Sequence, residues 1–141
     1  MKFVIAPDSF KGSLTAQEAA QAIATGLRRV FPNATYELVP MADGGEGTVQ
    51  SLVDATQGDF RQAVVLNPLG QPVTATYGLL GDHQTAVIEM AAARGIQFIN
   101  DQTKNPLITT TYGTGQLMLD AITHGAKELI IGTVSYTHLR A

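Results

Sequence analysis

The sequence contains no cysteine, and this absence excludes both disulfide bonds and thiolate metal ligands. It also has no excess of basic charge, because nine Lys and Arg stand against twelve Asp and Glu. We therefore expect neither nucleic acid nor an anionic membrane surface as a partner, since both are bound through clusters of basic side chains. No apolar run approaches the roughly 20 residues that cross a bilayer. The first residues resemble a strand more than a signal peptide, so a cytoplasmic location is expected.

What the sequence does have is enough apolar material for a folded core. Of its 141 residues, 45% are hydrophobic, a length and composition typical of one globular domain. Long runs of one charge are absent as well, so we do not expect disorder.

The first 58 residues alternate between strand and helix patterns. Apolar residues within 2–7 predict a buried parallel strand. Thr15 and Glu18 have the spacing of a capping box, and apolar residues then recur at helical intervals until Pro32, which ends the helix. Residues 35–39 predict a second strand, and a helix carrying Val49 follows and ends near residue 58. This β-α-β-α order predicts a parallel sheet with helices on it, whose binding crevice lies at the carboxyl ends of the strands.

The pattern changes after residue 58. Residues 60–66, 73–80 and 85–89 predict extended segments separated by turns, as in an antiparallel meander. A helix over 112–124, with Leu117, Met118 and Ile122 facing inward, and a buried strand over 127–131 follow. We therefore expect a parallel α/β unit in 1–58, an antiparallel insertion in 59–104 and a return to the first unit in 105–132.

The loop after the first strand contains the first group of candidate catalytic residues. It places Asp8, Ser9, Lys11, Gly12 and Ser13 between a strand and a helix. An aspartate can accept a proton from a substrate hydroxyl or hold a metal ion, and a lysine can neutralise carboxylate or phosphate oxygens. The alternative is an ordinary turn with solvated polar side chains.

A second loop, rich in glycine, precedes the next helix. Glycine lets backbone amides approach an anion, and a helix N-terminus favours phosphate or carboxylate. Either of its carboxylates is also a possible metal ligand, although the spacing matches neither the phosphate loop of nucleotide hydrolases nor the dinucleotide fingerprint. A flexible turn is the alternative. The loop comprises Asp43, Gly44, Gly45, Glu46, Gly47 and Thr48.

Other polar residues are weaker candidates. Hydroxyls within 109–115 would contact substrate or cap the next helix, and capping is favoured. Glu89 either faces the crevice from the edge of the insertion or is a surface carboxylate. His83, His124 and His138 lack ligand spacing, so we assign no metal ligand and no catalytic histidine.

Four segments, APDSFKGSLTAQEAA, PMADGGEGT, VIEMAAA and NPLITTTYGTGQL, occur in the order and spacing of the bacterial glycerate kinase family, which the chain resembles over residues 1–132. The resemblance implies a Rossmann-like parallel α/β domain interrupted by a smaller antiparallel inserted α/β domain. It also implies phosphoryl transfer from ATP, with Mg²⁺, to the small-molecule substrate D-glycerate. The two loops then hold the site. Lys11 would neutralise phosphoryl charge, and Asp43, or else Asp8, would orient or deprotonate the glycerate hydroxyl.

The sequence departs from the family in two places. Arg94 occupies a position where the family often has a small residue such as Ser. After Gly132 the family continues into another glycine-rich loop and more than half of its length, whereas residues 133–141 resemble a translated sequencing adapter. We therefore expect an incomplete fold, an N-terminal fragment that is inactive alone and poorly soluble because a sheet edge and apolar surface are exposed. A non-catalytic module that binds phosphate or carboxylate is the alternative function.

Overall fold

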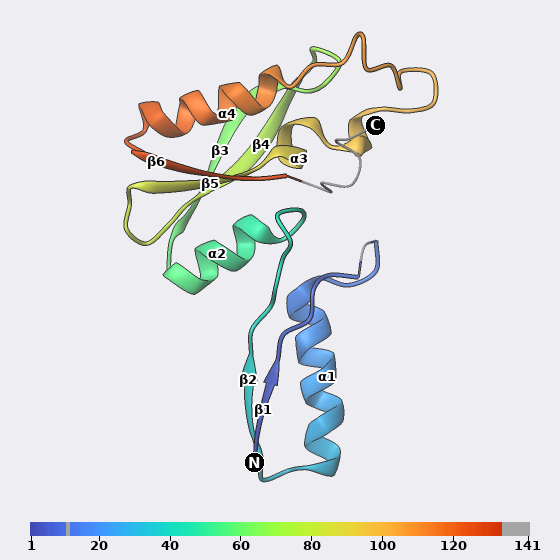
Figure 1. Ribbon diagram of the computed structural model, residues 1–141, viewed down its shortest axis with the longest axis vertical. Coiled ribbons are helices and arrows are strands. Elements are labelled where there is room, and N and C mark those ends of the chain that lie inside the picture. The colour runs from blue at the N-terminus through green and yellow to red at the C-terminus, as the bar shows by residue number, and fades with distance from the viewer. Residues whose placement is uncertain (11, 134–141) are drawn as a thin grey trace.

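The computed structural model describes residues 1–10 and 12–133, which form a mixed α/β fold with two sheets (Figure 1). The expected non-native tail therefore lies outside the described residues, apart from Thr133. Within the described part of the chain, no helix combines the length and the apolar character that crossing a membrane requires.

The first sheet pairs β1 (Lys2–Ile5) in parallel with β2 (Thr35–Leu38). Between them runs α1 (Ala16–Val30), which begins at the predicted capping box: the Thr15 side chain accepts from the Glu18 N–H, and the Glu18 carboxylate accepts from the Thr15 N–H. The core of this unit is small and consists of Ile5, Ala20 and Ala24, with partly buried neighbours around it. We call β1, α1 and β2 the first unit.

The second sheet has the strand order β3-β4-β5-β6. β3 (Asp59–Leu66), β4 (Pro72–Leu79) and β5 (Thr85–Glu89) form the expected antiparallel meander, and β6 (Glu128–Gly132) pairs with β5 in parallel. The sequence pattern predicts that residues 105–132 return to the first unit. In the structure β6 instead joins the sheet of the expected insertion, because a helical crossover brings it back beside β5.

Helices cover both faces of this second sheet (Figure 1). On one face, α2 (Thr48–Thr56) packs Val49 and Val53 against Val87. On the other face lie α4 (Tyr112–Thr123) and the short α3 (Met90–Arg94). The sequence patterns predicted α4 but not α3. A single helical turn, Ile96–Phe98, follows α3. We call the second sheet with α2, α3 and α4 the second unit.

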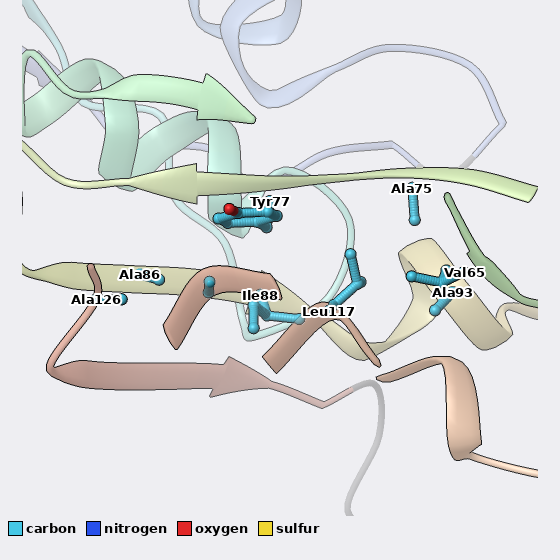
Figure 2. Close-up of a cluster of buried hydrophobic side chains, with 9 residues drawn as sticks. Val65, Ala75, Tyr77, Ala86, Ile88, Ala93, Leu117 and Ala126 are labelled. Carbon is cyan, nitrogen blue, oxygen red and sulfur yellow. The ribbon is translucent and has the colours of Figure 1, made fainter. Parts of the chain in front are cut away.

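The main core lies between the second sheet and α4 (Figure 2). Leu117 and Ile88 are completely buried there, next to Tyr77 and Val65. The Tyr77 hydroxyl donates to Asp120 at 3.0 Å, and burial raises the pKa of Tyr77 to about 12. Ile122, which we expected to face inward, is 52% exposed because it lies on the far side of α4. Gly125 follows the helix cap directly and has φ +100°, a conformation that glycine favours and that ends α4.

Candidate functional site

The two candidate loops leave the first sheet side by side. Beyond the last paired residues of β1 and β2, the Met41 N–H donates to the Pro7 carbonyl at 3.0 Å. Asp8 follows Pro7 directly, and Asp43 lies two residues after Met41. The carboxyl ends of parallel strands meet at one edge of a sheet, as the sequence order predicted.

The first loop is an exposed turn held by its own backbone. The Ser9 N–H donates to the Asp8 carboxylate at 2.6 Å, and the Ser13 N–H donates to the Phe10 carbonyl at 2.8 Å. Gly12 has φ +74°, a left-handed conformation that disfavours other residues. Asp8 and Ser13 are exposed, while Ser9 is half-buried. Lys11 lies outside the described residues, so its predicted role as the phosphate-neutralising amine stays a prediction.

Three amides of the glycine loop form hydrogen bonds within the loop itself. The Gly44 N–H donates to the Thr48 hydroxyl at 3.1 Å, and the Gly45 N–H donates to Asp43 Oδ1 at 3.1 Å. The Thr48 N–H donates to the Gly45 carbonyl at 3.2 Å. These bonds leave fewer amides for an external anion than the glycine count alone indicated. The carboxylates of Asp43 and Glu46, by contrast, are exposed.

Glu89 occupies the place at the N-terminus of α2 where we expected an anion. Its Oε1 accepts from the Val49 N–H at 2.9 Å, and its side chain is half-buried. Burial raises the pKa of Glu89, while the amides of Val49, Gly47 and Thr48 oppose that rise. The sequence pattern indicates Glu89 only as a crevice or surface carboxylate. Helix periodicity gives no signal for this contact, because it joins residues far apart in the chain.

The end of β6 also contacts the glycine loop. A Cβ atom added to Gly132 would lie 2.4 Å from the Gly44 carbonyl oxygen, and one added to Gly44 would lie 3.1 Å from the Thr133 carbonyl oxygen. Gly44 and Gly47 have φ +102° and +91°, so both adopt backbone conformations that glycine favours. The loop is therefore enclosed by backbone on the side of the second unit.

The third polar segment lies at the start of α4, where Thr111, the residue before the helix, forms no side-chain cap. The Thr110 hydroxyl accepts from the Tyr112 N–H at 3.1 Å. Thr114 is buried, and its hydroxyl has no hydrogen-bond partner among residues 1–10 and 12–133. Thr114 also lines a hollow of about 570 Å³ with Met90 and Tyr112.

A larger groove, of about 1250 Å³, lies between α1 and α2. Gly47 is in its lining, together with Arg29 of α1 and Asp54 of α2. Asp8 and Asp43 line neither this groove nor the hollow beside α4. The candidate catalytic carboxylates therefore lie at the exposed edge of the first sheet.

Comparison with known proteins agrees with the resemblance of the four segments. The chain is 60% identical over 132 residues to the glycerate kinase of Bacillus subtilis (strain 168), covering 94% of this chain and 35% of that protein. It is 54% identical to the glycerate 2-kinase of Escherichia coli (strain K12), with the same coverage of 94% and 35%.

A solved structure shares the fold. The crystal structure of putative glycerate kinase 2 from Salmonella typhimurium LT2 matches with a TM-score of 0.80 and 50% sequence identity, covering 94% of this chain and 36% of that one. The chain thus spans about a third of the length of the curated relatives it matches. The family profile described as the glycerate kinase family matches residues 3–134, and the chain belongs to that family.

Proposed function

We propose that this chain supplies the substrate-side loops of a phosphotransferase that moves the γ-phosphoryl group of ATP to an alcohol group of D-glycerate. The observation that carries the proposal is the pairing of the two loops at their origin, where the Met41 N–H donates to the Pro7 carbonyl. Because of this bond, the segments that carry Asp8 and Asp43 leave the sheet at the same edge. Family membership supplies the reaction class.

Asp43 is the residue we propose to orient or deprotonate the glycerate hydroxyl. Its Oδ1 accepts from the Gly45 N–H, which fixes the carboxylate and leaves Oδ2 for a substrate hydroxyl. Its exposure gives a small substrate access. Asp8, whose Oδ1 is held by the Ser9 N–H, is the second candidate for the same step. General-base catalysis of this kind contributes about 10²–10⁴-fold to a rate.

Charge neutralisation is the other requirement of phosphoryl transfer. We propose that Lys11 supplies a positive charge and that the hydroxyls of Ser9, Ser13 and Thr48 bind glycerate or phosphate oxygens. The glycines of both loops contribute by allowing the backbone turns. Because the amides of Gly44 and Gly45 are already engaged, we expect binding here to depend on side chains rather than on an amide cradle.

The carboxylates fit the demands of Mg²⁺. Among the described residues no group of three His, Cys, Asp or Glu side chains gathers to hold a metal by itself. A magnesium ion bound with nucleotide needs less, typically one or two carboxylates plus phosphate oxygens and waters. Asp8 and Asp43 provide such carboxylates. When bound, Mg²⁺ would offset charge on the phosphate oxygens of ATP.

The proposal is tested on the protein extended through its native reading frame to the length of its relatives. ATP and Mg²⁺ are supplied with D-glycerate, L-glycerate or glycolate, and ADP release is measured. We expect turnover with D-glycerate and little with the others, and we expect none from the 141-residue chain alone. Saturable binding of D-glycerate without turnover would instead favour the non-catalytic binding module.

Asp43→Asn in the extended protein tests the role of the carboxylate. The amide keeps the size and the bond from the Gly45 N–H but cannot take a proton, so kcat should fall by about 100-fold or more. Asp59→Asn is the matched control. Asp59 begins β3, the edge strand of the second sheet that lies farthest from β6 and the glycine loop. Near-normal kcat in Asp43→Asn would remove Asp43 from this role.

A further inference from the structure

We infer that Glu89 is a positioning residue for the glycine loop, residues 43–48: its carboxylate binds the N-terminus of α2 and so sets where Asp43 lies. The inference deepens the proposed function, on which its activity readout rests. Its structural basis is independent of any substrate.

The contact replaces a cap that α2 lacks. The residue before α2 is Gly47, which has no side chain to satisfy the first amides of the helix, and no side-chain cap is formed there. Helices leave their first amides without partners inside the helix, so these amides need acceptors from elsewhere. Glu89 provides one at 2.9 Å from the Val49 N–H, across 40 residues of chain.

The amides at the start of α2 favour a charged Glu89, although burial outweighs them and raises the pKa of this carboxyl. A helix N-terminus stabilises negative charge, typically by about 0.3–1 kcal/mol and by up to about 2 kcal/mol when partly buried. Burial is the main effect that opposes ionisation of Glu89 and the negative charge of Glu46 is a smaller one, whereas the amides of Val49, Gly47 and Thr48 favour ionisation. Because the protein's own carboxylate fills this position, a phosphate or a substrate carboxylate has to be bound elsewhere.

A second contact beside Glu89 holds the other end of the loop. Glu89 and Gly132 are register partners on β5 and β6, so both lie at the same carboxyl edge of the second sheet. Gly132 packs its backbone against Gly44, the residue after Asp43. The loop is thus fixed at Gly44 by β6 and at Val49 by β5. Asp43 projects from just outside this pair of anchors.

Small displacements of a catalytic group have large kinetic effects, because a shift of about 1 Å can reduce a rate about 100-fold. Releasing the Val49 anchor would let the start of α2 and the loop before it move. A purely stabilising cap would affect only the folded fraction. A positioning residue would also affect turnover by molecules that remain folded.

The test compares Glu89→Ala and Glu89→Gln in the extended protein, at a temperature where both remain folded by circular dichroism. Glu89→Ala removes the acceptor and should lower kcat at least about tenfold, with KM for ATP changed less than about threefold. Glu89→Gln retains an oxygen that accepts from Val49 and should restore kcat to within about threefold of the unmodified protein. Glu128→Ala, at the far end of β6, is the control and should leave both constants unchanged.

Hydrogen exchange separates failure of the inference from failure of the proposed function. In Glu89→Ala, peptides covering 44–53 should exchange faster, while those covering 112–123 should not change. Unaltered kcat with only a lower melting temperature would overturn the inference. If the unmodified protein does not phosphorylate glycerate, the proposed function fails, and the exchange result alone then supports or overturns the anchoring of the loop by Glu89.

Discussion

The two units of the chain differ in how completely they bury their apolar side chains. The largest fully buried side chains, Tyr77, Ile88, Leu117, Val65 and Val87, all lie in the second unit. In the first unit two of the three core residues are alanines, and Val4 and Val30 remain 61% and 69% exposed. A two-stranded sheet with one helix buries little area, so it is expected to be marginal by itself.

This difference indicates which unit holds the glycine loop in place. Both candidate loops begin in the less packed first unit, which by itself would hold them loosely. The glycine loop gains its order from the second unit, through Glu89 at the start of α2 and Gly132 at Gly44. Residues on β5 and β6 of the well-packed second unit thus position a loop that begins in the less well-packed first unit.

The largest effect on this comparison should come from Leu117→Ala. Leu117 is completely buried between α4 and the second sheet (Figure 2), so the change leaves a cavity and should lower the free energy of unfolding by about 2–5 kcal/mol. Denaturant titration measures the loss, and hydrogen exchange should locate it in the second unit.

Leu119→Ala is the matched control, since Leu119 lies on the same helix and is 64% exposed. It should change stability by less than about 0.5 kcal/mol. Equal losses in the two variants would mean that the second unit is not the better packed part of the chain.

Gly132→Ala should have the next largest effect, by disturbing the contact between the two units. The added Cβ would lie 2.4 Å from the Gly44 carbonyl oxygen, a backbone atom that moves only if the glycine loop moves. Crowding of this kind costs about 1–3 kcal/mol, and exchange should increase in peptides covering 43–48.

Gly115→Ala provides the comparison for that variant. Gly115 lies within α4, and an added Cβ would meet no atom within 4 Å. Since alanine favours a helix over glycine, this change should stabilise the chain by up to about 1 kcal/mol. Similar exchange in both variants would contradict the close contact between Gly132 and the loop.

Much of the fold could be predicted because its signals are local. The Thr15 and Glu18 capping box fixed the start of α1, and alternation with turn residues indicated the meander of β3 to β5. The pairing of β6 with β5 could not be predicted in this way. Strand partners are chosen by tertiary packing, and the apolar pattern of β6 suits either sheet.

For the candidate site, the position of the two loops could be predicted from the sequence in the same way. Strand-to-helix loops with acids and glycines located Asp8 and Asp43 at one edge of the first sheet. The role of Glu89 was not predictable, because a long-range carboxylate at a helix start has no spacing signature. Glycine-rich composition likewise indicated a loop whose amides approach an anion, whereas the N–H groups of Gly44 and Gly45 donate to neighbouring side chains in the structure.

The smallest predicted effect probes the first unit through Thr15→Ala. The change removes the hydroxyl that caps the Glu18 N–H at 3.2 Å and should destabilise α1 by about 1 kcal/mol. Exchange should rise in peptides covering 16–30 and stay constant in the second unit. Gly26→Ala in the same helix should act in the opposite direction by up to about 1 kcal/mol, because its added Cβ would meet nothing within 4 Å. If Thr15→Ala instead increased exchange equally in both units, the two units would unfold as one cooperative body. The stability of the first unit would then depend on the second unit, although the two have separate cores.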